Sequence, residues 1–466
     1  MARRFLLAVP LALPFAFATG MAQAPSPSAA LPPPRADYAL TNVRIVTAPG
    51  RVIERGTVLT KNGRIAAVGA QVAIPAGVVQ MDLSGHTVYP GLIDAATSIG
   101  LPSPSRALPV APAPGATPPA GGRGGGGGGG RGAGPVGRGA VAPPAPVVDP
   151  EIDAAAEAAD MFSPTDDQLK AFRAGGVTTV GLVFEGGIFP GRVGAALTGS
   201  PDVSPLALRT AVAQAVSFGT RRAGAYPGTG IGSVAYIRQS FLDAQYEARL
   251  DKAFKAGTPG ARPSNDPLRR ALMPAAGNEM TSWFVASTER EMIRAGEITR
   301  EMGLKTPVIV GAQEGWRAVS AIKHSGATAV VSVRWPSADV VTGRQFLAVG
   351  SGLTGTAPPA DSSANREVRA NPAALVRAGI TVALSSYGGE SGTTFRDGIR
   401  AAIGAGMSAD DALRAATVTP AALLGVTAAV GTIEVGKLAN LVVVTGNDLF
   451  ASGNPIKHVF IEGRIY

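Results

Sequence analysis

The sequence predicts an α/β protein in which a large domain built on a parallel sheet interrupts a small β domain. In the middle of the 466-residue chain, apolar runs of strand length alternate with helical segments. This order is typical of parallel strands joined by right-handed crossovers. At both ends of the chain, short runs of β-branched residues are separated by Gly, Asn and Pro. We therefore expect the two ends to form one β domain.

Residues 38–90 and 431–466 supply the strands of the predicted β domain. The first segment begins with YALTNVRIV, and KNGR at 61–64 places an Asn-Gly turn between two further strands. The second segment contains LVVVTG and IKHVFIEGRIY, in which short strands again end at turn residues. We expect these strands to form a small β-sandwich.

The predicted large domain spans residues 91–430. One of its helices, SPTDDQLKAFRAGG, is expected to begin with Ser163 as the N-cap and Pro164 at the first helical position. Strands are expected at 177–184, 306–312, 328–335 and 380–386, and further helices at 288–305, 314–326 and 371–379. The alternation alone is compatible with a closed (β/α)8 barrel and with an open doubly wound sheet.

The first 24 residues are typical of a secretory signal peptide. Arg3 and Arg4 precede the apolar run FLLAVPLALPFAFA, and Ala22 and Ala24 form a cleavage site. We expect cleavage near Ala24, a flexible lead-in over residues 25–37, and a periplasmic or secreted mature protein. No later run reaches about 18 apolar residues, so we expect no transmembrane segment. The chain has no cysteine, which excludes disulfides and thiolate metal ligands.

A Gly/Pro/Arg-rich tract over residues 102–150 interrupts the large domain directly after its first strand. Its centre, GGRGGGGGGGRGAGPVGRG, has too few apolar side chains to offset the entropy of ordering, so we expect a disordered insertion at the rim of the domain. The formal charge of +9 depends on this tract and on the leader, because without their six arginines about +3 remains. The basic composition therefore indicates no nucleic-acid partner.

Two motifs near the ends of the chain resemble the amidohydrolase superfamily. MDLSGHTVYPGLIDAATSIG resembles its junction between the β domain and the first barrel strand, and GMSADDALRAATVTPAALLGVTAAVGTIEVGKLANLVVV resembles its C-terminal helix and return to that domain. FRAGGVTTVGLV and GLKTPVIVGAQEGW are similar to inner stretches of exported members that resemble imidazolonepropionase. The resemblance covers residues 38–466 apart from the insertions. It implies a TIM-type (β/α)8 barrel and metal-dependent hydrolysis of C–N bonds.

The resemblance also implies metal ligands that this sequence lacks. Two family histidines of the pattern GLIDxHxH match Ala96 and Ser98. A family aspartate that binds metal and acts as the base matches Tyr387, or Ser386 if the register shifts by one, and a strand that would end in histidine has Ala286. Methyl, hydroxyl and phenol groups are poor ligands for zinc. We therefore expect no metal, no other cofactor and no catalytic residue at these positions.

The three histidines of the chain are not expected to replace these ligands. His86 precedes the first barrel strand, His324 lies near a helix C-terminus, and His458 lies on a strand of the β domain. No G-x-S-x-G elbow and no Gly-Lys-Ser/Thr loop is present. A pair of carboxylates at strand ends, Glu185 and Glu314, is one remaining route to hydrolysis.

A polar rim is nevertheless expected where the barrel strands end. Asp94 is expected to hydrogen-bond backbone groups at the end of the first strand. The candidate ligand-binding residues of this rim are Glu185, Gln313, Glu314, Arg334, Trp335, Ser386 and Tyr387.

These observations predict a secreted, metal-free member of the family that binds a small molecule or a partner chain, such as an active relative. A homo- or hetero-oligomer is compatible with this role. Two alternatives stay open. One is an active hydrolase of non-peptide amide or cyclic amide C–N bonds that uses zinc or another divalent metal. The other is a structural subunit of an envelope assembly that the Gly/Arg tract contacts.

Overall fold

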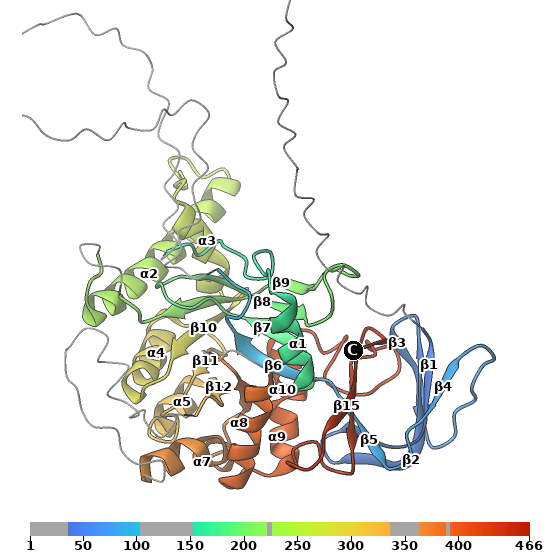
Figure 1. The fold of residues 1–466 in the computed structure, drawn as a ribbon. Helices are drawn as coiled ribbons and strands as arrows, with labels where there is room; N and C mark the ends of the chain where they lie inside the picture. The colour runs from blue at the N-terminus through green and yellow to red at the C-terminus, as the bar shows by residue number, and fades with distance from the viewer. Residues whose placement is uncertain (1–35, 103–151, 221–225, 336–362, 388–391) are drawn as a thin grey trace, which may run out of the picture.

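The computed structural model describes residues 36–102, 152–220, 226–335, 363–387 and 392–466, and it contains two eight-stranded sheets (Figure 1). The predicted signal peptide and residues 103–150 of the predicted insertion lie outside the described residues. Within the described ranges, no helix combines the length and the apolar character needed to cross a membrane.

The first sheet joins strands from both ends of the chain in the order β16-β15-β14-β5-β1-β2-β3 (Figure 1). β4 pairs with the beginning of β1, and β5 pairs with the same strand further along. Asn62 and Gly63 both have positive φ in the predicted turn between β2 and β3. The strands are β1 (Tyr38–Ala48), β2 (Arg51–Lys61), β3 (Arg64–Gly69), β4 (Val79–Asp82), β5 (His86–Pro90), β14 (Leu441–Thr445), β15 (Ile456–Ile461) and β16 (Arg464–Ile465).

This sheet folds over a core of its own, so the expected sandwich of two sheets is replaced by one curved sheet. Its two edges approach each other, because Ala439 N donates to Gly63 O at 2.9 Å and Gly463 N donates to Ala439 O at 3.2 Å. The approach requires glycine, since a Cβ on Gly463 would lie 3.0 Å from the Gly63 Cα. The enclosed core includes Leu40, Ile45, Val58, Leu441, Val443 and Phe460.

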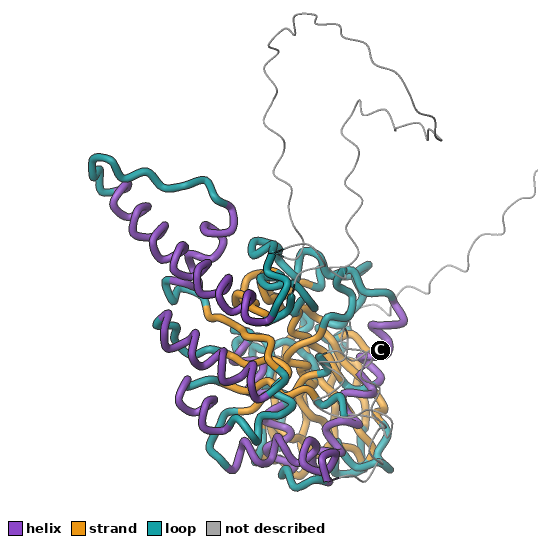
Figure 2. Tube along the Cα trace, turned by 90° about the vertical axis from the view of Figure 1, so that its left-hand side faces the viewer, coloured by secondary structure: helices purple, strands orange, loops and turns teal. Residues whose placement is uncertain are grey.

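The second sheet is a nearly closed barrel with the strand order β13-β12-β11-β10-β9-β8-β7-β6, and helices lie on its outside (Figure 2). Its strands are β6 (Leu92–Thr97), β7 (Val177–Leu182), β8 (Gly191–Leu197), β9 (Ala207–Ser217), β10 (Thr281–Ala286), β11 (Val308–Gly311), β12 (Thr328–Ser332) and β13 (Val382–Ser385). The helices of the described chain are α1 (Asp166–Ala174), α2 (Gly230–Lys255), α3 (Pro267–Ala276), α4 (Glu289–Met302), α5 (Val319–Ser325), α7 (Ser363–Arg377), α8 (Gly392–Gly404), α9 (Ala409–Ala415) and α10 (Val418–Leu423).

One strand departs from the predicted parallel pattern. β8 runs antiparallel to both of its neighbours, β7 and β9, while the other adjacent pairs in this sheet are parallel. The connections before and after β8 span residues 183–190 and 198–206. Both are shorter than the dozen or so residues that a parallel crossover needs. The sheet therefore contains two hairpins at this place.

Alternating side chains fill the inside and the outside of the barrel. On β10, Trp283 packs in the inner cluster with Val310 and Ala383, whereas Phe284 packs in the outer cluster with helix residues such as Met292. This alternation is the layered filling of a small barrel, and it leaves the interior a packed core and not a pore.

Three helices begin two or more residues away from the predicted start, and one of them is α5, which begins at Val319 and not at Glu314. α1 begins after Thr165 and not after Ser163, because Thr165 and Gln168 form a reciprocal capping box. α7 begins at Ser363, eight residues before the predicted start, and it contains Pro372.

Buried arginines connect the barrel helices to the strands and loops beside them. Arg396 on α8 donates through Nε to Leu449 O at 2.9 Å and through Nη2 to Asn454 O at 2.8 Å. Burial lowers the pKa of its guanidinium to about 10, so Arg396 stays charged at neutral pH. Arg173 on α1 donates to Thr198 O at 2.8 Å and lies 4.6 Å from the centre of the Tyr466 ring.

Gly181 on β7 is predicted to be intolerant of any side chain. A Cβ at this position would lie 2.1 Å from Ala95 O on the neighbouring strand. Gly181→Ala should therefore lower the free energy of unfolding by about 3 kcal/mol or more, because backbone cannot yield as a flexible side chain can. Chemical denaturation followed by circular dichroism measures the change. Gly404→Ala, where nothing lies within 4 Å of the added Cβ, is the control and should not be destabilising.

Candidate functional site at the barrel mouth

The first and last strands of the barrel are joined by a buried carboxylate. β6 and β13 lie beside each other, but in the described chain no ladder of backbone hydrogen bonds pairs them. Asp94 on β6 instead accepts a hydrogen bond from Ser386 N at 2.8 Å and one from the Ser386 hydroxyl, directly after β13. It also accepts from Ala96 N at 3.3 Å. Asp94 therefore bridges the seam at which the barrel closes.

Burial changes the acidity of Asp94. The side chain is fully buried, and desolvation raises the pKa of its carboxyl from 3.8 to about 7, although the hydrogen bonds from Ser386 and Ala96 act in the opposite direction. We expected Asp94 to bind backbone groups at the strand end. The structure adds the Ser386 hydroxyl, so Ser386 is a buried structural partner and not an accessible member of the rim.

A second group of polar side chains connects the ends of β6, β7 and β13. Ser98 Oγ donates to the exposed Glu185 carboxylate at 2.7 Å, and Tyr387 OH donates to Phe184 O at 3.2 Å. Burial, and to a lesser extent the charge of Glu185, raises the pKa of the Tyr387 phenol. Tyr387 is therefore protonated at neutral pH and cannot act as a base.

The remaining predicted rim residues have other local partners. Gln313 Nε2 donates to Arg334 O at 3.4 Å across the ends of β11 and β12. Glu314 accepts from Glu289 N at 2.9 Å, at the beginning of α4, and Trp335 Nε1 donates to Gly398 O on α8 at 2.8 Å. Trp335 and Glu314 therefore bind neighbouring helices and are partly exposed, as are Ser98 and Gln313. Glu185 and Arg334 are exposed.

The side chains that the structure describes at the mouth do not fit a divalent metal ion. Ala96 is fully buried in the inner cluster and offers only a methyl group, while Ala286 packs in the outer cluster, so its position does not face the barrel interior as expected. The described residues contain no group of three or more His, Cys, Asp or Glu side chains placed to hold a metal. The Asp94 oxygens are also engaged with Ser386 and Ala96.

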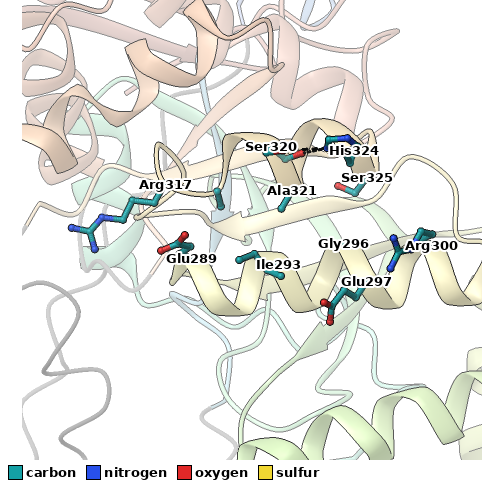
Figure 3. A pocket seen from close by; sticks show the side chains of 11 residues that line it. Glu289, Ile293, Gly296, Glu297, Arg300, Arg317, Ser320, Ala321, His324 and Ser325 are labelled. Carbon is teal, nitrogen blue, oxygen red and sulfur yellow. Dashed lines mark hydrogen bonds between the residues drawn. The ribbon is translucent and has the colours of Figure 1, made fainter.

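The three histidines lie away from the ends of the barrel strands. His86 and His458 lie on β5 and β15 of the first sheet. His324 lies on α5, with its Nδ1 2.7 Å from Ser320 O. His324 lines a groove of about 440 Å³ between α4 and α5 on the outside of the barrel, together with residues such as Ile293, Gly296 and Arg300 (Figure 3). None of the three can therefore complete a catalytic centre at the mouth.

The barrel, the separate sheet and the position of the mouth define a TIM-type architecture with an added β domain. Residues 330–466 match the model described as the amidohydrolase family. No curated protein matches the chain.

Similar solved structures share this fold over nearly the whole chain. An amidohydrolase from Thermotoga maritima MSB8 has a TM-score of 0.68 and 21% identity, covering 92% of this chain and 99% of that chain. Phenylurea hydrolase B has a TM-score of 0.51 and 14% identity, covering 92% and 97%. A Xaa-Pro dipeptidase with bound methionine in its active site has a TM-score of 0.50 and 16% identity, covering 92% and 100%. At these identities the likeness shows the fold alone.

The raised pKa of Asp94 predicts a specific dependence of stability on pH. Because the folded chain holds this proton more tightly than the unfolded chain, the contribution is fully present below about pH 4 and is lost as the pH rises to about 7. Asp94→Asn cannot lose this contribution, because asparagine does not titrate. The free energy of unfolding of the variant, relative to that of the parent, should therefore increase by a few kcal/mol between about pH 4 and pH 7, since one pKa unit corresponds to about 1.4 kcal/mol. Denaturant unfolding at several pH values measures the difference. A difference that stays constant from pH 4 to pH 8 would contradict a titrating Asp94.

Removing the hydroxyl of Ser386 should destabilise the barrel. Ser386→Ala leaves a buried carboxylate without its O–H donor, which should cost about 1–3 kcal/mol of unfolding free energy at neutral pH. Ser98→Ala removes a similar hydroxyl–carboxylate bond at the exposed rim and should cost less than about 1 kcal/mol. Thermal and denaturant unfolding compare the two variants. Equal losses would show that Ser386 has no special role at the seam.

Proposed function

We propose that this chain is an exported member of the amidohydrolase superfamily that binds a polar ligand at its barrel mouth and has lost metal-dependent hydrolysis. The family match over residues 330–466 and the shared fold support membership. The signal-like sequence of residues 1–24 supports export to the periplasm or beyond the cell.

We base the proposed loss of hydrolysis on one observation: the Asp94 carboxylate is buried and its oxygens are already hydrogen-bonded. A metal-activated water requires an ion held by imidazole or carboxylate groups that also leave an open coordination position. Asp94 is fully buried and bonded to Ser386 and Ala96, and the neighbouring positions offer the Ala96 methyl and the protonated Tyr387 phenol. These groups stabilise the barrel, and the described residues place no group of three or more His, Cys, Asp or Glu side chains where it could hold an ion.

The polar groups that stay accessible are suited to binding. Ser98 and Glu185 form a hydroxyl–carboxylate pair at one side of the mouth, and Gln313 and Arg334 supply an amide and a guanidinium at another. A few convergent polar groups above a packed apolar floor are typical of sites for small polar molecules. A partner chain, such as an active relative, would use the same groups.

The alternative is an active hydrolase of C–N bonds. A measurement of the metal bound to the chain distinguishes it from the proposed binding role. The paired-carboxylate route is not supported, because Glu185 and Glu314 are bonded to different elements, Ser98 on one side and the start of α4 on the other.

Elemental analysis of the full chain, purified without chelator and then dialysed against zinc, tests the proposal. We expect well below one equivalent of zinc, iron or manganese per chain. We also expect the same content in Asp94→Asn and Glu185→Gln, because neither carboxylate holds an ion. His324→Gln controls for metal bound on the outer surface. Stoichiometric metal that is lost in Asp94→Asn or Glu185→Gln but kept in His324→Gln would overturn the proposal.

A further inference from the structure

The end of helix α2 presents charged side chains of one sign to solvent. Residues 245–266 comprise the last turns of α2, its connection to α3 and the N-cap of α3, and we call this segment the α2–α3 tip. It contains four basic and three acidic side chains, but only the basic ones are exposed. The exposed cations are Arg249, Lys252, Lys255 and Arg262. The surface of the tip is therefore complementary to an anionic partner.

The three acids of the tip are bound to other groups of the chain. Glu247 is buried and accepts a hydrogen bond from Ser264 Oγ at 2.9 Å. Asp251 lies 2.6 Å from Lys255 Nζ, and Asp266 accepts from a backbone N–H as the N-cap of α3. Of the four exposed cations, only Lys255 has an acidic partner among the described residues. The other three are therefore available to a partner.

Two aromatic side chains are exposed among these cations. Phe254 is 58% exposed and Tyr246 is 52% exposed. Phe254 lies in the last turn of α2 beside Lys255, and the centre of the Tyr246 ring lies 5.8 Å from the Arg249 guanidinium carbon. Exposed aromatic rings gain free energy when they leave water. A partner that suits the tip therefore offers an apolar layer and anionic groups at the same place.

The tip has few neighbours in the rest of the described chain. Residues 256–260 are all exposed, and a Cβ added at Gly257 or Gly260 would have nothing within 4 Å. In Figure 2, two helices and the loop between them project from the upper part of the molecule, at the place that α2 and α3 have in Figure 1. The tip is therefore accessible to an extended surface.

We propose that the α2–α3 tip binds the surface of a membrane that contains anionic lipids. The headgroups of such lipids attract Lys and Arg, and the boundary between headgroups and acyl chains accepts Phe and Tyr rings. The surface of a nucleic-acid duplex offers phosphates but no such apolar layer. The barrel mouth is not part of the tip, so membrane binding and the proposed ligand binding stand or fall separately.

Sedimentation with lipid vesicles tests the proposal. The chain that begins at Pro25, the expected product of cleavage, is used so that the apolar run of residues 1–24 does not itself bind lipid. The vesicles contain phosphatidylcholine alone or phosphatidylcholine mixed with phosphatidylglycerol. We expect binding to the mixed vesicles only. We also expect this binding to weaken at high salt, because salt screens the attraction between basic side chains and the headgroups.

Removal of charge at the tip is compared with removal of the same charge elsewhere. Lys252→Gln combined with Arg262→Gln should lower the affinity for mixed vesicles at least about tenfold, since each basic residue at the surface contributes roughly fivefold. Arg51→Gln combined with Lys61→Gln is the matched control. Both control positions are exposed on the first sheet, at the other side of the molecule (Figure 1), and their loss should change the affinity less than about twofold.

Substitutions of Phe254 test the apolar part of the contact. Phe254→Ser should lower the affinity for mixed vesicles about tenfold, whereas Val435→Ser, at a position that is 65% exposed and outside the tip, should leave it unchanged. Phe254→Trp places a fluorescent ring at the tip. Vesicles with brominated acyl chains should quench its emission more strongly than that of the parent, which has three tryptophans of its own.

Three results would overturn the proposal, provided that circular dichroism shows the variants to be folded. The first is no binding of the parent to mixed vesicles. The second is an equal affinity in the tip variants and their matched controls, which would assign the binding to another part of the chain. The third is binding to a short DNA duplex that the tip variants weaken, without binding to vesicles.

Discussion

The barrel depends on the hydrogen bonds by which Asp94 joins β6 to Ser386 at the end of β13. Every other neighbouring pair of strands in this sheet has a backbone ladder, but in the described chain its first and last strands, β6 and β13, have none between them. The bonds from Ser386 and Ala96 offset part of the cost of burying this carboxyl, whose pKa still rises to about 7. The same bonds engage the oxygens by which Asp94 could bind a metal ion. One interaction therefore joins the first and last strands of the barrel and occupies its buried carboxyl group.

Much of the fold could be predicted from the sequence, because strand and helix periods are local properties of the chain. The alternation of apolar strands and helices indicates a sheet flanked by helices, and strands at the two ends indicate a shared sheet. The closure of the large sheet into a barrel was implied by the family resemblance. β8 and β9 were not predicted, so the antiparallel direction of β8 was missed with them. The number of sheets formed by the chain ends was also missed. It depends on the close approach of Gly63 and Gly463, which are about 400 residues apart in the sequence. No local sequence pattern predicts such a contact.

The candidate site was harder to predict because its properties depend on long-range partners. The residue types at Ala96, Ser98 and Tyr387 were sufficient to expect that metal ligands are missing. The roles of the polar residues were not readable in the same way. Ser386 is hydrogen-bonded to Asp94, and Trp335 is hydrogen-bonded to α8. Ala286 faces outward because side chains alternate between the two faces of β10. Glu185 and Arg334 are the exposed members of the predicted rim in the described chain, and Ser98 and Gln313 are partly exposed beside them.

The carboxyl-carbon NMR resonance of Asp94, assigned by comparison with Asp94→Asn, tests most directly whether this residue closes the barrel or holds a metal. If Asp94 is the buried partner of Ser386, its resonance should titrate near pH 7 and should not move when one equivalent of zinc is added. A resonance that stays in its charged position down to about pH 4, the ordinary range of an aspartate, or that shifts stoichiometrically with zinc, would contradict this role.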